Sequence, residues 1–222
     1  ERTRMSSLSV RRRHLLIAAV LAPCLAHAQG RTPPKEGKDF TLVRPPQPTE
    51  GANKIEVLEF FQYTCPHCAT YDPVLAAWRK TLPADVEYRR NPIAWNDQTL
   101  PHVKIYFTLE ALKKTEELHA KVFRAVQVDR RPLLKTDEIA DFMAANGIDR
   151  KQWLDTFNSF AVGTRASRAS QVWKAFKVDG TPAMAIDGKF MTAPHMVGSR
   201  EGSLPVMDYL IQRARTERGG KK

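Results

Sequence analysis

With 222 residues, the chain is long enough to bury a hydrophobic core without crosslinks, and its three cysteines are too few for a small scaffold held together by disulfides. Its formal net charge is +11, but the basic residues are scattered among acidic ones, and no basic patch is interleaved with aromatic residues. No nucleic-acid partner is therefore expected. The sequence contains no internal repeat and no low-complexity block.

Residues 1–28 are predicted to be a leader with a secretory signal peptide. Met5 is interpreted as the start and residues 1–4 as an upstream remnant. Three arginines (Arg11–Arg13), an apolar stretch (15–25) and Ala26-His27-Ala28 then follow in the order typical of a signal peptide with a small-x-small cleavage site. The apolar stretch is too short to span a bilayer. We therefore expect cleavage near Ala28 and export of the mature chain.

Two cysteines, Cys65 and Cys68, remain after the leader and its Cys24 are removed. Export places this pair in an oxidising compartment, where disulfide chemistry persists. A bridge between residues three apart closes too small a loop to restrict the unfolded chain, so it would add little stability. The pair is therefore expected to serve chemistry rather than stability.

The elements around this pair follow from the hydrophobic pattern. The run 55–61 is apolar enough to be a buried central strand, with Glu59 as an exception. In chain order we expect extended linkers over 29–38 and 45–53, a short edge strand between them over 39–44, the central strand, a helix from Cys65 to about Thr81, and a strand over 86–93.

From residue 97 to residue 176 the hydrophobic residues recur at helical spacing. Five helices are expected: over 100–112, over 118–126, from Thr136 to Gly147, from Asp149, and over 162–176. Asp149 and Gln152 form a capping box at the start of the fourth. We interpret the apolar stripes of these helices as packing surfaces.

Strand character returns over 183–186 and 190–192, and Asp187-Gly188 between them is a strong hairpin signal. A helix over 203–215 closes the chain, and its basic end (Arg213, Arg215, Arg218, Lys221, Lys222) is interpreted as frayed and solvated. The pattern thus predicts an α/β domain that a block of helices interrupts.

The cysteine pair stands where the central strand turns into a helix, and this position predicts its chemistry. The first turn of a helix has unpaired N–H groups and the positive end of the dipole, which favour an anion. Cys65 at the cap position accepts hydrogen bonds from the amides of His67 and Cys68. Pro66 at the first helical position loses no hydrogen bond. A protonated His67 adds positive charge. These effects lower the pKa of Cys65, whereas Cys68 is expected to be a more ordinary, buried thiol.

A stabilised thiolate makes the disulfide form of the pair ready to accept electrons, and it makes Cys65 a good leaving group. A substrate thiolate attacks Cys65 and forms a mixed disulfide, and a second substrate thiol then displaces Cys65. The residues therefore predict a dithiol oxidant that needs no cofactor beyond the Cys65–Cys68 disulfide.

Three segments resemble the DsbA family of periplasmic thiol–disulfide oxidoreductases: the strand 56–61, Cys65-Pro66-His67-Cys68 and the segment 178–183 around Thr181-Pro182. The likeness covers essentially the whole mature chain. It implies an α/β thioredoxin fold interrupted by an all-helical insertion, with residues 29–96 and 169–222 in the thioredoxin-like domain and 97–168 in the insertion. It also implies periplasmic localisation.

The resemblance also implies roles for residues outside the cysteine pair. Pro182 matches the family's cis-proline, against which a substrate peptide aligns, and Thr181 matches the preceding residue that tunes thiolate stability. Glu59 matches a buried acid that relays the proton of the resolving Cys68, and Asp72 falls where a further acid often occurs. The implied partners are exported proteins with free thiols and a DsbB-like, quinone-linked membrane protein that reoxidises the pair.

Three other functions share some of these sequence features. A zinc site is not expected because the mature chain has no second cysteine pair and no two histidines with finger-like spacing. His102, His119 and His195 are instead expected at the surface or the edge of the core. A disulfide isomerase or reductase of the same superfamily is closer in chemistry, but an isomerase usually carries an N-terminal dimerisation domain. A non-enzymatic binder of unfolded chains is the third alternative.

Overall fold

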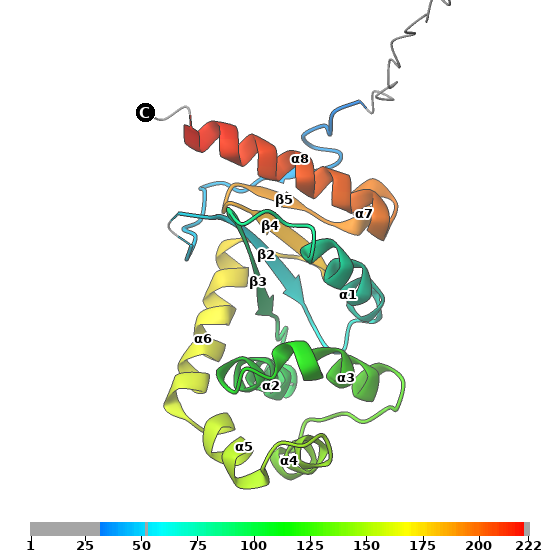
Figure 1. Cartoon of the computed structure of the whole chain (residues 1–222), viewed down its shortest axis with the longest axis vertical. Coiled ribbons are helices and arrows are strands. Elements are labelled where there is room, and N and C mark those ends of the chain that lie inside the picture. Colours follow the sequence, from blue (N-terminus) through cyan, green and yellow to red (C-terminus); the bar gives the residue numbers. More distant parts are fainter. Residues whose placement is uncertain (1–31, 52, 220–222) are drawn as a thin grey trace, which may run out of the picture. The chain divides into compact units, whose positions relative to one another are not determined.

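A five-stranded sheet in the order β1-β5-β4-β2-β3 is the centre of the fold (Figure 1). The computed structural model describes residues 32–51 and 53–219, and the predicted signal peptide, Cys24, Lys221 and Lys222 lie outside them. Among the described residues, no helix is long and apolar enough to cross a membrane. The strands are β1 (Thr41–Leu42), β2 (Ile55–Phe61), β3 (Val86–Pro92), β4 (Ala183–Ile186) and β5 (Phe190–Thr192).

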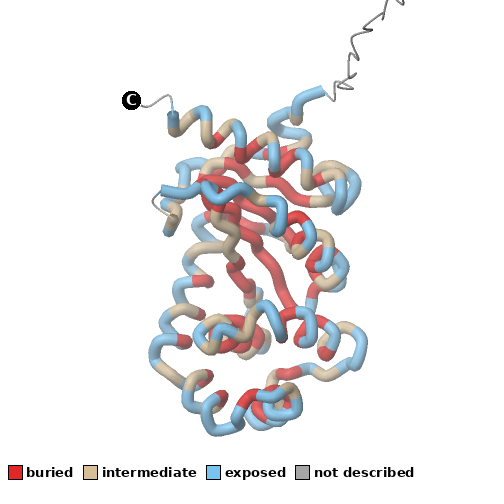
Figure 2. The backbone as a smooth tube through the Cα atoms, viewed as in Figure 1, coloured by how far each residue is buried: buried red, intermediate tan, exposed pale blue. Residues whose placement is uncertain are grey.

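Strand β2 is buried along its whole length because it has neighbours on both sides and helices on both faces (Figure 2). It pairs in parallel with β3 and antiparallel with β4. The side chains of Ile55 and Val57 pack on α1 (Pro66–Arg79) and α8 (Arg200–Gly219). The alternate residues Leu58 and Phe60 pack on the opposite side with the end of α6 (Phe160–Ala175).

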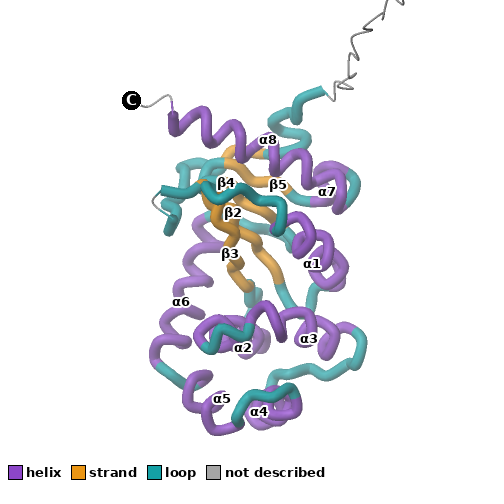
Figure 3. The backbone as a smooth tube through the Cα atoms, viewed as in Figure 1, coloured by secondary structure: helices purple, strands orange, loops and turns teal. Residues whose placement is uncertain are grey.

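The segment between β3 and β4 is helical (Figure 3), and its helices build a second hydrophobic core. The buried side chains of Leu109, Leu118, Met143 and Trp153 lie at its centre, and Phe61 at the end of β2 joins it. The elements are η1 (Asp97–Thr99), α2 (Leu100–Ala111), α3 (Thr115–Gln127), α4 (Thr136–Ala145), α5 (Arg150–Phe157) and α6. This core lies beyond the C-terminal ends of the parallel strands β2 and β3, and at this end β2 leads to the cysteines.

The predicted order of elements is confirmed, and the predicted α/β fold with a helical insertion is present. Asp149 caps α5 through a hydrogen bond from the amide of Gln152 (2.7 Å). Asp187 and Gly188 have positive φ angles of 56° and 65°, as a two-residue hairpin turn requires. Helix α6 is continuous across residues 168 and 169, where the insertion was expected to end. A short helix, α7 (Pro194–Val197), was not expected.

The interpretation of the basic C-terminal end as frayed and solvated is wrong for the arginines that the structure describes. Helix α8 continues to Gly219, and Arg213, Arg215 and Arg218 each pair with a carboxylate. Arg218 binds both carboxylate oxygens of Asp187, whose side chain is only 2% exposed. The ion pair therefore fastens α8 to the β4–β5 turn, far away in the sequence.

This pair predicts an unequal effect of two arginine substitutions. Arg218→Ala leaves the buried Asp187 carboxylate with only Lys189 at 3.2 Å and should lower the free energy of unfolding in urea by about 1–3 kcal/mol. Arg215→Ala is the matched control, because its partner Asp85 is 47% exposed, and it should change the free energy of unfolding much less than Arg218→Ala does. Equal, negligible losses would support a frayed helix end instead.

Candidate active site

The chain places Cys65 at the N-terminus of α1 because β2 ends four residues earlier and the connecting turn leads directly into the helix. Cys65 is the N-cap residue, with extended backbone angles, and Pro66 opens the helix. The Cys65 Sγ accepts a hydrogen bond from the amide of Cys68 at 3.2 Å. Both cysteines are free thiols. Cys65 is 9% exposed and Cys68 is fully buried, so only Cys65 presents its sulfur to a substrate.

The loop before β4 brings Thr181 and Pro182 beside this sulfur. Since β4 runs antiparallel to β2, with Ala183 opposite Phe60, the residues before β4 lie at the end of β2 that leads to Cys65. The thiol of Cys65 donates to the carbonyl oxygen of Thr181 at 3.3 Å. The Thr181–Pro182 peptide bond is cis, as the resemblance implies.

The two sulfurs have opposite acidities. The hydrogen bond from the Cys68 thiol, followed by the side chain of Thr181 and by the amides of Cys68 and His67, lowers the pKa of Cys65 to about 6, although burial opposes this. Burial raises the pKa of Cys68 far above its usual value, and the neighbouring Cys65 adds to this effect. At neutral pH the reduced pair therefore holds one thiolate, at Cys65, and one thiol, at Cys68.

A groove of about 590 Å³ adjoins the pair. One side consists of His67, Thr181 and Pro182, and the other comes from α7 and the start of α8. The side chain of His67 is exposed at this groove. An extended peptide lying here would pass beside the residues that flank Cys65. The residues of the groove from α7 and α8 are Pro194, His195, Gly198, Ser199, Arg200 and Glu201.

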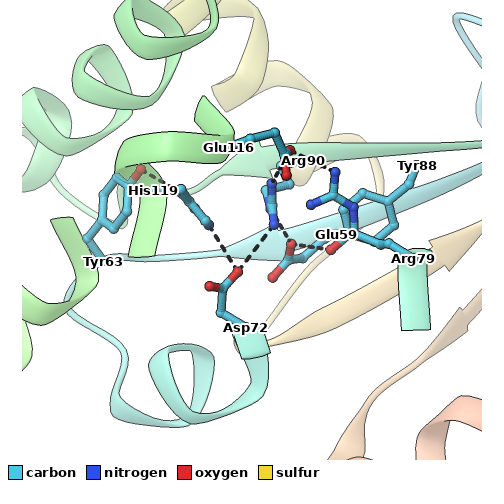
Figure 4. A network of polar contacts seen from close by, with 8 residues as sticks. All are labelled: Glu59, Tyr63, Asp72, Arg79, Tyr88, Arg90, Glu116 and His119. Carbon is cyan, nitrogen blue, oxygen red and sulfur yellow. Dashed lines mark hydrogen bonds and ion pairs between the residues drawn. The ribbon is translucent and has the colours of Figure 1, made fainter. Parts of the chain in front are cut away.

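Glu59 lies on the face of β2 that α1 covers, and its side chain is 1% exposed. Its Oε2 accepts hydrogen bonds from Arg90 Nε at 2.9 Å and from the Tyr88 hydroxyl at 2.5 Å. Its Oε1 is buried and has no hydrogen-bond partner among the described residues. Arg90 also binds Asp72 on α1 (3.2 Å), so it bridges the two buried carboxylates (Figure 4).

Sequence reasoning missed Arg90 and His119 in this network. The expectation that His102 and His119 lie at the surface or core edge is wrong, because each is 3% exposed. The signal for His119 was its spacing: Val122 and Phe123 follow at i+3 and i+4, which puts the imidazole on the buried side of α3. Among the residues that the structure describes, no cluster of three His, Cys, Asp or Glu side chains could hold a metal ion.

Comparison with known proteins agrees with this geometry. The family model of the DSBA-like thioredoxin domain matches residues 83–201. The thiol:disulfide interchange protein DsbA of Bordetella parapertussis is 41% identical over 202 residues, which cover 90% of this chain and 96% of that protein. The chain belongs to the DsbA family. It is thus a thiol–disulfide oxidoreductase with a thioredoxin fold.

Solved structures of DsbA proteins have the same fold. The crystal structure of Pseudomonas aeruginosa DsbA superposes with a TM-score of 0.81 at 34% identity, over 83% of this chain and 96% of that one. Reduced DsbA1 of Neisseria meningitidis gives a TM-score of 0.77 at 25% identity, over 86% of this chain and 100% of that one. This chain therefore shares the helical insertion with the other members of the family.

The electrostatics of the pair predict a single titration in the reduced protein. Thiolate absorbance in the ultraviolet should follow one group with a pKa near 6, which is Cys65. Cys68 should contribute no absorbance below the pH at which the protein unfolds, because burial raises its pKa. The Cys65→Ser variant should show no thiolate transition in this pH range, whereas the Cys68→Ser variant should still show one, from Cys65. A transition near the pKa of free cysteine, roughly 8.5, would contradict this assignment.

Proposed function

We propose that this DsbA-family protein donates its Cys65–Cys68 disulfide to cysteines of unfolded or folding exported proteins in the periplasm. The proposal is carried by the contrast between the two sulfurs: a stabilised thiolate at the helix N-terminus and a buried thiol one turn later. A stabilised Cys65 thiolate favours the reduced pair, so the oxidised pair accepts electrons from a substrate. The leader with its signal-like order supports export.

The reaction follows from the accessibility of Cys65. A substrate thiolate attacks the Cys65 sulfur, forms a substrate–Cys65 disulfide and releases Cys68, which takes up one proton. A second substrate thiol loses its proton and attacks the substrate sulfur of this mixed disulfide. Cys65 leaves as the thiolate. The substrate has then lost two electrons to form its disulfide, and the pair has gained them. Counted from two substrate thiols, the reaction releases one proton, because Cys68 ends protonated and Cys65 ends as the thiolate.

Thr181, Pro182 and His67 are proposed to bind the substrate around the attacked sulfur. They form one side of the groove beside Cys65, where the backbone of an extended peptide can align along the cis-proline loop. The Thr181 carbonyl already accepts a hydrogen bond from Cys65, so it also contributes to the position of the sulfur. Pro66 stiffens the turn between the two cysteines.

Reoxidation requires the buried Cys68 thiol to attack a mixed disulfide at Cys65, and a DsbB-like, quinone-linked membrane protein is the proposed oxidant. The raised pKa of Cys68 makes a nearby base necessary. Glu59 is proposed to accept this proton because it lies on the α1-facing side of β2 and its Oε1 is buried without a partner among the described residues. No further cofactor is proposed.

Trapping tests the roles of the two cysteines. After its Cys65 is oxidised, the Cys68→Ser variant should accumulate a mixed disulfide between Cys65 and a cysteine-containing substrate peptide. The neighbouring thiol that would reverse this reaction is absent from the variant. Cys65→Ser should form none, since Cys68 is fully buried. Non-reducing electrophoresis and mass spectrometry measure the adduct. An adduct on Cys68, or retained folding activity of Cys65→Ser in cells, would favour a simple binder instead.

Substitution of Glu59 tests its proton-accepting role. Glu59→Gln should slow the reoxidation of the reduced protein by oxidised glutathione by roughly a hundredfold, the low end of what a positioned acid–base group contributes. Glu56→Gln is the matched control, because Glu56 is also a buried acid of β2 that pairs with an arginine but points to the other face. Equal rates in the two variants, measured by stopped flow, would exclude Glu59 from the proton transfer.

A further inference from the structure

The imidazole of His119 connects the helical insertion to both ends of the redox segment (Figure 4). Its Nδ1 lies 2.8 Å from the hydroxyl of Tyr63, and its Nε2 lies 3.4 Å from Oδ1 of Asp72. Tyr63 stands two residues before Cys65, and Asp72 follows Cys68 by one helical turn. One side chain of α3 thus contacts the chain before and after the two cysteines.

The hydrogen-bond chemistry fixes the direction of these contacts. Burial lowers the pKa of His119 although Asp72 opposes this, so the ring is neutral near pH 7. A neutral imidazole has one donor and one acceptor nitrogen, and a carboxylate accepts only. Nε2 has no hydrogen-bond partner among the described residues, but the Asp72 carboxylate 3.4 Å away favours the proton on this nitrogen, so Nδ1 accepts a hydrogen bond from the hydroxyl of Tyr63. Burial raises the pKa of Tyr63, which keeps this hydroxyl protonated.

Packing leaves the ring of His119 little freedom. The rings of Phe61 and Phe123 meet it edge-on, each with its centroid at 5.0 Å. Tyr63 is held a second time, because Gln127 at the end of α3 donates to its carbonyl oxygen at 2.7 Å. Tyr63 is therefore fixed to α3 by both its side chain and its backbone.

We propose that His119 is a positioning residue for the disulfide exchange: through Tyr63 it fixes the turn that holds Cys65 at the N-terminus of α1. The direction of the turn before an N-cap decides whether the cap atom meets the helix amides. If Tyr63 is released, the Cys65 sulfur is expected to lose part of its 3.2 Å contact with the Cys68 amide. This inference rests on the proposed role of Cys65 as the exposed, attacked sulfur.

The contact to Asp72 has a different consequence from the contact to Tyr63. Asp72 keeps Arg90 as a second partner at 3.2 Å, so loss of the imidazole leaves its charge compensated. The other ionisable groups that are electrostatically coupled to His119 or Asp72, or that pack against the imidazole, belong to β2, β3, α1, α2 and α3: Glu59, Arg79, Arg90, Glu116 and, by ring contact, Tyr106. Their arrangement does not depend on the hydroxyl of Tyr63. The Tyr63 contact is therefore the one that acts on Cys65.

Two amide substitutions separate these contacts. The δ atoms of asparagine are as many bonds from the backbone as Nδ1, whereas the ε atoms of glutamine match Nε2. His119→Asn should keep an acceptor for Tyr63, and His119→Gln should lose it. We expect His119→Gln to raise the pKa of Cys65 by about 0.5–1 unit, the shift that loss of a capping hydrogen bond corresponds to, and His119→Asn to leave it unchanged.

Two further variants complete the test, which follows thiolate absorbance in the reduced full chain. Tyr63→Phe removes one oxygen atom and should raise the Cys65 pKa as His119→Gln does. Met143→Ala removes buried side chain from α4 and should lower the thermal midpoint without changing this pKa. An unchanged pKa in both Tyr63→Phe and His119→Gln, or equal shifts in the asparagine and glutamine variants, would overturn the inference. An ordinary Cys65 pKa in the unsubstituted protein would instead refute the proposed function itself.

Discussion

The sulfur of Cys65 accepts a hydrogen bond from the amide of Cys68 in the first turn of α1, and the other parts of the site depend on this contact. Strand β2 delivers Cys65 to the helix, and β4, paired antiparallel with β2, brings Thr181 within 3.3 Å of the same sulfur. The hydrogen bond from the Cys68 thiol and the amides of the first turn favour a thiolate at Cys65, while burial and the neighbouring Cys65 keep Cys68 protonated. One helix N-terminus thus divides two chemically identical side chains into a leaving group and a resolving thiol.

The helical insertion takes part in the same arrangement. Its core includes Phe61 and Tyr63, so the segment that leads to Cys65 is packed against α3 as well as held in the sheet. Behind α1, Arg90 joins the carboxylates of Glu59 and Asp72 in a buried network. A buried carboxylate is costly without a partner, and Arg90 supplies one while leaving Oε1 of Glu59 free of hydrogen bonds among the described residues. This free oxygen is the observation on which the proposed transfer of the Cys68 proton to Glu59 rests.

Local signals in the sequence were enough for the strands, most helices and the cap position of Cys65, because periodicity and capping act over a few residues. The resemblance added Thr181, Pro182 and the burial of Glu59. Partners that lie far apart in sequence could not be found in this way. Arg218 looked like part of a solvated tail because its partner Asp187 lies 31 residues earlier. His119 and Arg90 looked like ordinary polar residues, since their burial depends on how α3 and β3 meet α1.

The most direct test compares the free energy of unfolding of the reduced and oxidised proteins at pH 8. The folded state lowers the Cys65 pKa from 9.0 to about 6, so the thiolate adds stability to the reduced protein that is complete above the unfolded pKa and is lost as the pH falls through 6. We predict that the reduced protein is the more stable one at pH 8 and that this advantage shrinks towards pH 5. A more stable oxidised protein at both pH values, the usual effect of a structural disulfide, would contradict the central role of the Cys65 thiolate.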